Sequence, residues 1–99
     1  MAIVDVTIVP LGTATPSISK YVADCHKVLN DFPGLKWKLN PGSTTIEGDL
    51  NTILEVILKM HEVPFDQGAK RVSTHIKIDD RRDKPASMEQ KLKSVQDKL

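Results

Sequence analysis

The sequence predicts one α+β domain with the element order β-α-β-β-α-β and a short helix after it. Several segments alternate apolar and polar residues with the period of two that is typical of half-buried strands. Two longer segments repeat apolar residues at helical spacing, and Pro, Gly and Asn residues lie between the segments. A chain of 99 residues is the size of one compact domain, so we expect residues 1–99 to form a single unit.

The first strand and helix are expected in the first third of the chain. Residues 3–10 are rich in β-branched side chains and place alternate residues from Val4 to Ile8 on one face. Thr15 followed by Pro16 is typical of a helix start. A Pro-Gly pair should end this helix. Its apolar stripe is Ile18, Tyr21, Val22, Cys25, Leu29 and Phe32.

A hairpin should follow the first helix. Leu35, Trp37 and Leu39 alternate with lysines, which predicts a strand with one buried face. The turn signal at residues 40–42 indicates that residues 43–48 return as the hairpin partner. The faces of this partner carry Thr44 and Ile46 on one side, and Thr45 and Glu47 on the other.

The second half of the chain predicts a helix, a strand and a further helix. Asp49 can cap the helix, and residues 71–79 alternate as a last strand. The tail from Ser87 onward repeats apolar residues at helical spacing. The inner positions of the two helices are Leu50, Ile53, Leu54, Ile57 and His61 in the first, and Met88, Leu92, Val95 and Leu99 in the second.

This order predicts the ferredoxin-like sandwich, in which a four-stranded antiparallel sheet carries two helices on one face. The uncovered face of the sheet should then be largely polar. Such a face can be solvated, or it can be the surface on which subunits meet and hold a small polar ligand. The expected residues are Asp5, Thr7, Lys36, Lys38, Thr45, Glu47, Ser73, His75 and Lys77.

Composition excludes several classes of partner. Fourteen Lys and Arg against thirteen Asp and Glu give a net charge of +1, which offers no basic footprint for nucleic acid. Neither the first nor the last strand carries an aromatic residue on which RNA bases could stack. The sequence has no apolar run near the roughly 20 residues of a membrane span. A single cysteine fits a reducing compartment, so we expect a small cytoplasmic protein with no membrane partner.

The side chains do not form a catalytic or metal-binding motif. Cys25 lies on the apolar stripe and is expected in the core, while His26 should be on the surface and His75 on the open face. The three histidines have no metal-ligand spacing, and no phosphate- or dinucleotide-binding motif is present, so neither a metal nor a cofactor is expected. The loop after the first strand also lacks the arginine of an acylphosphatase-type site. The sequence therefore does not support an enzyme.

Two features of the sequence suit a ligand-binding role. Glu47 is a carboxylate inside a strand, where Glu is disfavoured, and Gly48 beside it leaves room for another group to approach. With the neighbouring threonines it can form the polar floor of a pocket, although a surface Glu in a strand is also ordinary. The charged segment Asp79–Asp83 can form solvated or inter-subunit ion pairs, or an anion site at its two arginines.

Five blocks of the chain form a specific pattern: residues 10–13, residues 17 and 19–22, residues 44–48, residues 68–72 and residues 76–83. The most specific are residues 44–48, with Thr45, Glu47 and Gly48, and residues 76–83, the last strand with its charged end. In this pattern the chain resembles the thiamine-binding protein family, which is related to hydroxymethylpyrimidine-binding proteins. The likeness extends in order from residue 3 to about residue 98.

The resemblance implies a homotetramer, built as a dimer of dimers, that binds thiamine or its hydroxymethylpyrimidine moiety without catalysis. It implies Thr45 and Glu47 as ligand contacts, with Ser19 as a further candidate, and assigns Arg71 and the charged segment to subunit contacts. The alternative is an oligomeric regulatory or interaction protein that binds a different metabolite or a protein partner.

Overall fold

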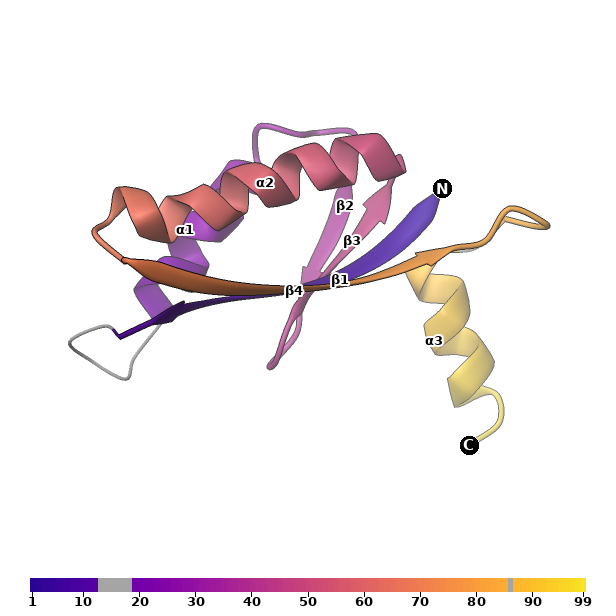
Figure 1. Ribbon diagram of the computed structural model, residues 1–99. Helices are drawn as coiled ribbons and strands as arrows, with labels where there is room; N and C mark the ends of the chain where they lie inside the picture. The colour runs from indigo at the N-terminus through magenta and orange to yellow at the C-terminus, as the bar shows by residue number, and fades with distance from the viewer. Residues whose placement is uncertain (13–18, 86) are drawn as a thin grey trace.

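The computed structural model describes residues 1–12, 19–85 and 87–99, and it confirms the ferredoxin-like fold (Figure 1). The sheet is antiparallel, with the strand order β2-β3-β1-β4. Thr15, Pro16 and Ile18, on which the predicted start of the first helix rested, lie outside the described residues. The elements are β1 (Ala2–Leu11), α1 (Ser19–Leu29), β2 (Lys36–Leu39), β3 (Thr44–Gly48), α2 (Leu50–Asp66), β4 (Arg71–Asp80) and α3 (Met88–Gln96).

The central strand β1 fixes which side chains share a face of the sheet. It pairs with β3 on one side and with the whole length of β4 on the other, with Val4 opposite both Ile46 and Ile78. Val4 and Ile46 are fully buried. The predicted alternation is therefore confirmed in β1 and β3, whereas Ile76 and Ile78 of β4 share the face of Val4 but are nearly half exposed.

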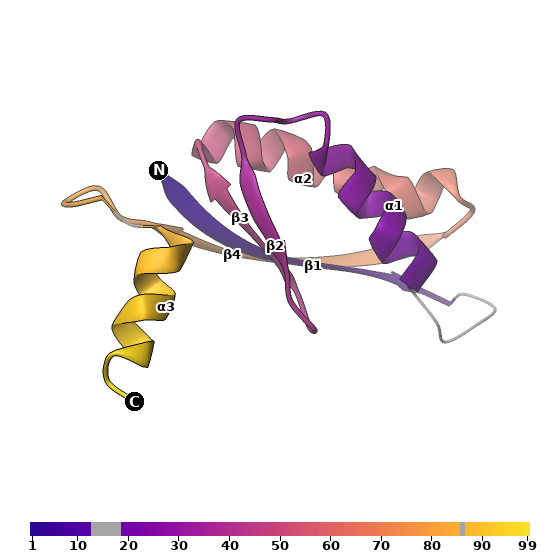
Figure 2. The same ribbon diagram turned by 180° about the vertical axis from the view of Figure 1, so that it is seen from behind.

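Helices α1 and α2 lie together on one face of the sheet, while α3 extends from the other side (Figures 1 and 2). The core fills the space between the sheet and the two helices. Burying its apolar side chains there removes them from water, which stabilises the fold. Asp49 caps α2 as expected, because its side chain accepts a hydrogen bond from the Thr52 amide at 3.1 Å. The core includes Val4, Val6, Cys25, Leu29, Ile46, Ile53, Val56, Ile57 and Met60.

A polar contact on the outside joins the two core helices. Asp24 of α1 accepts hydrogen bonds from Gln67, at the end of α2, and from Lys20 on its own helix. The hydrogen bond from Gln67, followed by those from Lys27 and Lys20, lowers the pKa of Asp24 to about 2.

The prediction that β2 has one buried face is wrong. All four residues of this edge strand are exposed, with Trp37 at 38% and Leu39 at 56% of their accessible area. Leu35, just before the strand, is buried as expected. The reason is geometric: a cavity separates the first two turns of α1 and the hairpin β2–β3, so no helix covers the inward side chains of β2.

Among the described residues, none of the helices combines the length and apolarity needed to span a bilayer.

Candidate functional site

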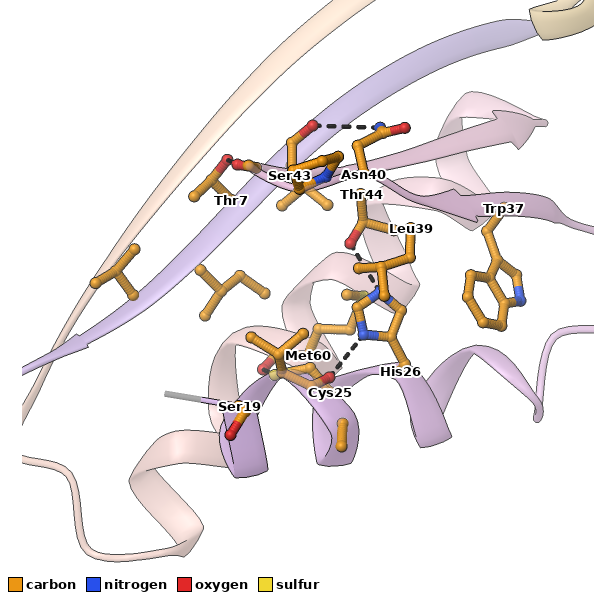
Figure 3. Close-up of a pocket in the computed structure, with 17 residues that line it drawn as sticks. Thr7, Ser19, Cys25, His26, Trp37, Leu39, Asn40, Ser43, Thr44 and Met60 are labelled. Carbon is orange, nitrogen blue, oxygen red and sulfur yellow. Dashed lines mark hydrogen bonds between the residues drawn. The ribbon is translucent and has the colours of Figure 1, made fainter. Parts of the chain in front are cut away.

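A cavity of about 940 Å³ lies between α1, the far end of β1 and the β2–β3 hairpin (Figure 3). Its size is in the range of sites for small organic molecules. Most of its wall is apolar, and no Asp, Glu, Lys or Arg side chain is among the described residues that line it. The apolar lining includes Val6, Ile8, Val22, Leu39 and Met60, and the polar lining includes Thr7, Ser19, His26, Asn40, Ser43 and Thr44.

A histidine and a threonine meet across this cavity. His26 projects from α1, and its Nε2 lies 2.8 Å from Oγ1 of Thr44, the first residue of β3. Its Nδ1 lies 2.6 Å from the carbonyl oxygen of Val22, one turn earlier in the helix. These two contacts fix the imidazole ring between the helix and the sheet (Figure 3).

Trp37 and the hairpin turn line the cavity beside the exposed side chains of β2, and we call this solvent-exposed side its mouth. The ring centroids of Trp37 and His26 are 5.2 Å apart, with the planes tilted by 42°. Thr7 of β1 donates a hydrogen bond of 3.1 Å to the carbonyl oxygen of Gly42, which holds the turn beside β1. The half-exposed indole is therefore available to stack on a ring that enters between the hairpin and α1.

Cys25 also lines the cavity, and its thiol is buried and hydrogen-bonded. The side chain is buried, and its thiol donates a 3.4 Å hydrogen bond to the carbonyl oxygen of Met60. Burial, together with the nearby charge of Asp24, raises the pKa of the Cys25 thiol to about 11. The thiol is thus protonated at neutral pH, which confirms that Cys25 belongs to the core.

The structure does not bring the three sequence-predicted site residues together. Ser19 lines the cavity at the start of α1. Thr45 and Glu47 lie on the other face of the sheet, because their neighbours Thr44 and Ile46 point toward the helices. Their role as ligand contacts stays a prediction.

Both residues on that other face already have partners within the chain. The Thr45 hydroxyl donates to Asp5 at 2.6 Å and accepts from Asn40 at 2.7 Å. Glu47 is only 3% exposed, and its Oε1 accepts a 3.0 Å hydrogen bond from the backbone amide of Met88, the first residue of α3. The structure thus shows Glu47 holding the N-terminus of α3 against the sheet.

Of the polar residues that line the cavity, sequence reasoning proposed Ser19 as a ligand contact but missed His26 and Thr44. The prediction that His26 is a surface residue is wrong, since it is half-buried and bonded to Thr44. A signal was present: His26 follows Val22 by four residues and so shares the inward side of α1. Trp37, expected in the core, is instead half-exposed at the cavity mouth.

The charged segment Asp79–Asp83 forms ion pairs within one chain. Arg81 donates to Asp83 at 2.6 and 2.9 Å, and Arg82 donates to Asp80 at 3.0 and 2.7 Å. These bonds lower the pKa of both carboxyl groups. Asp79 pairs with Lys91 of α3. Within residues 1–12, 19–85 and 87–99, no three His, Cys, Asp or Glu side chains are grouped to hold a metal ion.

The architecture and cavity define a ferredoxin-like protein with a space for a small organic molecule between a helix and the sheet. The profile of the thiamine-binding protein family matches residues 4–96. The chain is 51% identical over 98 residues to the UPF0045 protein YqgV of Bacillus subtilis (strain 168), covering 96% of this chain and 94% of that protein. The chain therefore belongs to the thiamine-binding protein family.

Solved structures of similar chains agree with this fold. The hypothetical protein MJ1052 of Methanocaldococcus jannaschii matches with a TM-score of 0.88 and 36% identity, over 96% of this chain and 95% of that one. A candidate thiamine biosynthesis/salvage protein of Thermotoga maritima matches with a TM-score of 0.76 over 95% of this chain and 97% of that one. Its identity of 20% makes this second likeness one of fold.

Proposed function

We propose that the protein binds thiamine or its hydroxymethylpyrimidine moiety in the cavity between α1 and the sheet, without catalysing a reaction. The observation that carries this proposal is the cavity of about 940 Å³, which has apolar walls and a fixed His26–Thr44 pair. A flat heteroaromatic ring gains from apolar walls, and its polar edge needs a small number of placed partners. The family to which the chain belongs is named for binding rather than for a reaction.

The charge of the cavity supports a particular orientation of thiamine. Thiamine joins a neutral aminopyrimidine to a permanently cationic thiazolium. The described lining has no carboxylate to balance a buried cation, so the pyrimidine is the half that suits the interior. The thiazolium then lies at the mouth, where the face of Trp37 attracts a cation and water solvates it.

We further propose that the protein is a cytoplasmic homotetramer, a dimer of dimers. β4 is a ten-residue strand at the edge of the sheet, and a free edge of this length favours pairing with a second copy. Ile76 and Ile78 on this strand are nearly half exposed. The free, buried Cys25 thiol fits a reducing compartment.

A specific observation favours a second candidate, an oligomeric regulatory or interaction protein. The apolar stripe of α3 is exposed, with Leu92 and Val95 open to solvent, and Leu99 after the helix is open to solvent as well. An exposed apolar stripe on a helix can dock against another chain. In that case the cavity holds a different metabolite or none.

Calorimetric titration with thiamine and with hydroxymethylpyrimidine tests the binding proposal. Val22→Phe fills the cavity from α1 and should weaken binding at least tenfold, while Leu58→Phe on the exposed side of α2 should leave it unchanged. A vitamin panel in thermal unfolding provides a second measurement, because a ligand of the folded state raises the melting temperature. Absence of heat and of any thermal shift would favour the interaction protein.

A further inference from the structure

The partners of His26 determine where the protons of the His26–Thr44 pair lie. The Val22 carbonyl oxygen, 2.6 Å from Nδ1, can only accept a hydrogen bond, so Nδ1 must carry a proton. In the neutral imidazole Nε2 is then an acceptor. With a neutral ring, the Thr44 hydroxyl, 2.8 Å away, donates its one proton to Nε2.

This arrangement fixes whether the cavity wall at Thr44 can donate or accept a hydrogen bond. Thr44 lines the cavity, and its hydroxyl proton is already used. The hydroxyl oxygen keeps only lone pairs for a molecule in the cavity, so it can accept but not donate. A ligand group that brings a second acceptor to this point leaves two buried lone pairs facing each other.

We propose that His26 is a positioning residue that fixes the Thr44 hydroxyl as an acceptor, so that the cavity selects rings carrying an amine or another hydrogen-bond donor. This inference rests on the proposed function and names the edge of the ring that the site recognises. His26 acts through Thr44 and need not touch the ligand itself. A buried polar mismatch costs more binding free energy than a missing methyl group. The affinity for a ring with a donor should therefore exceed the affinity for a ring without one by tenfold or more.

Calorimetry with two matched compounds tests this selection. The probes are hydroxymethylpyrimidine with its ring amine, and the same ring with a methoxy group in place of the amine, which accepts but cannot donate. The protein should bind the amine at least about tenfold more tightly. His26→Phe frees the Thr44 hydroxyl to rotate, so the preference should fall to about threefold or less, and Thr44→Val should remove it.

A second histidine–threonine pair supplies the matched control. Nδ1 of His61 lies 2.6 Å from Oγ1 of Thr74, and neither residue is among those that line the cavity. His61→Phe breaks a bond of the same kind elsewhere in the fold and should leave the preference unchanged. Nitrogen NMR of the His26 ring gives a readout independent of any ligand, and should show the neutral tautomer protonated at Nδ1.

The outcomes separate this inference from the proposed function. Equal binding of the two compounds, or a His26 tautomer protonated at Nε2, overturns the role of His26 and leaves the proposed function in place. Binding of neither compound overturns the proposed function and this inference with it. If His26→Phe does not fold, Thr44→Val and the NMR tautomer still decide the question.

Discussion

Glu47 has a structural partner that its sequence environment did not reveal. Its Oε1 accepts the Met88 amide at 3.0 Å, and a carboxylate at this position is also favoured by the positive end of the helix dipole of α3. A ligand on the open face would have to compete with the Met88 amide for the buried Glu47 carboxylate. This contact therefore favours the cavity near His26 over Glu47 as the site of binding.

We expect Glu47→Gln to change the affinity for thiamine by no more than about twofold, because the substitution lies on the face opposite the cavity. Gln keeps an acceptor for Met88, whereas Glu47→Ala removes it and should speed hydrogen exchange of the Met88 amide at least tenfold. Calorimetry and exchange measured by NMR check these effects. A tenfold to hundredfold loss of affinity in Glu47→Gln would support the sequence-based assignment of Glu47 to the ligand.

The buried Cys25 thiol makes stability depend on alkaline pH. Its pKa is about 11 in the folded protein against an ordinary value of 9.0, so between these values the unfolded chain loses the proton first. The free energy of unfolding should therefore fall as pH rises from 9 to 11, by at most about 1.4 kcal/mol per pH unit from this group. Urea titrations of the protein and of Cys25→Ala check this, and parallel pH profiles of the two would contradict it.

Among the contacts between strands and loops, Gly48 allows β3 and the segment before β2 to pack closely. Its φ is +157°, and a Cβ atom there would lie 2.5 Å from Cδ2 of Leu35. The sequence indicated that Gly48 leaves room for another group, and the structure identifies that group as the buried Leu35 side chain. Glycine at the end of β3 thus serves the core on the helix side of the sheet.

Gly48→Ala should destabilise the protein by about 1–3 kcal/mol, since Leu35 must leave its rotamer or the strand must shift. Gly34→Ala is the matched control, because a Cβ at that position meets no atom within 4 Å. Its effect should stay within about 0.5 kcal/mol. Chemical denaturation of both variants provides the measurement, and equal stabilities would show that Leu35 adapts without cost.

In the described part of a single chain, the edge strand β4 leaves one side of the sheet without a partner strand. β4 is hydrogen-bonded to β1 along one side, and its other side is an edge of the sheet. The ion pairs of the charged segment at its end are satisfied within the chain. Assembly through β4 would therefore depend more on its apolar side chains than on Arg81 or Arg82.

Light scattering should give the mass of a tetramer at micromolar concentration, and Ile78→Lys should lower that mass. Ile78 is 46% exposed, so a lysine can extend to water in the single chain but is unfavourable inside an apolar interface. Leu58→Lys on the exposed side of α2 is the control and should leave the mass unchanged. A monomeric mass for the unsubstituted protein would overturn the proposed assembly.

The elements, their order and the fold class can be predicted from the amino-acid sequence, because they depend on local periodicity and local caps. The alternation in β1 and β3 and the Asp49 cap of α2 can be read within a few residues. The burial of Cys25 follows from the same helical period.

The site could not be predicted in this way, because the contacts that form it join residues far apart in the chain. His26 meets Thr44 across 18 positions, and Glu47 meets Met88 across 41. Whether α1 packs directly on β2 or leaves a cavity beside Trp37 depends on how the helix lies over the sheet, which no local pattern encodes. Periodicity assigns a side chain to a face, but the distance between two faces is set by the packing of the whole core.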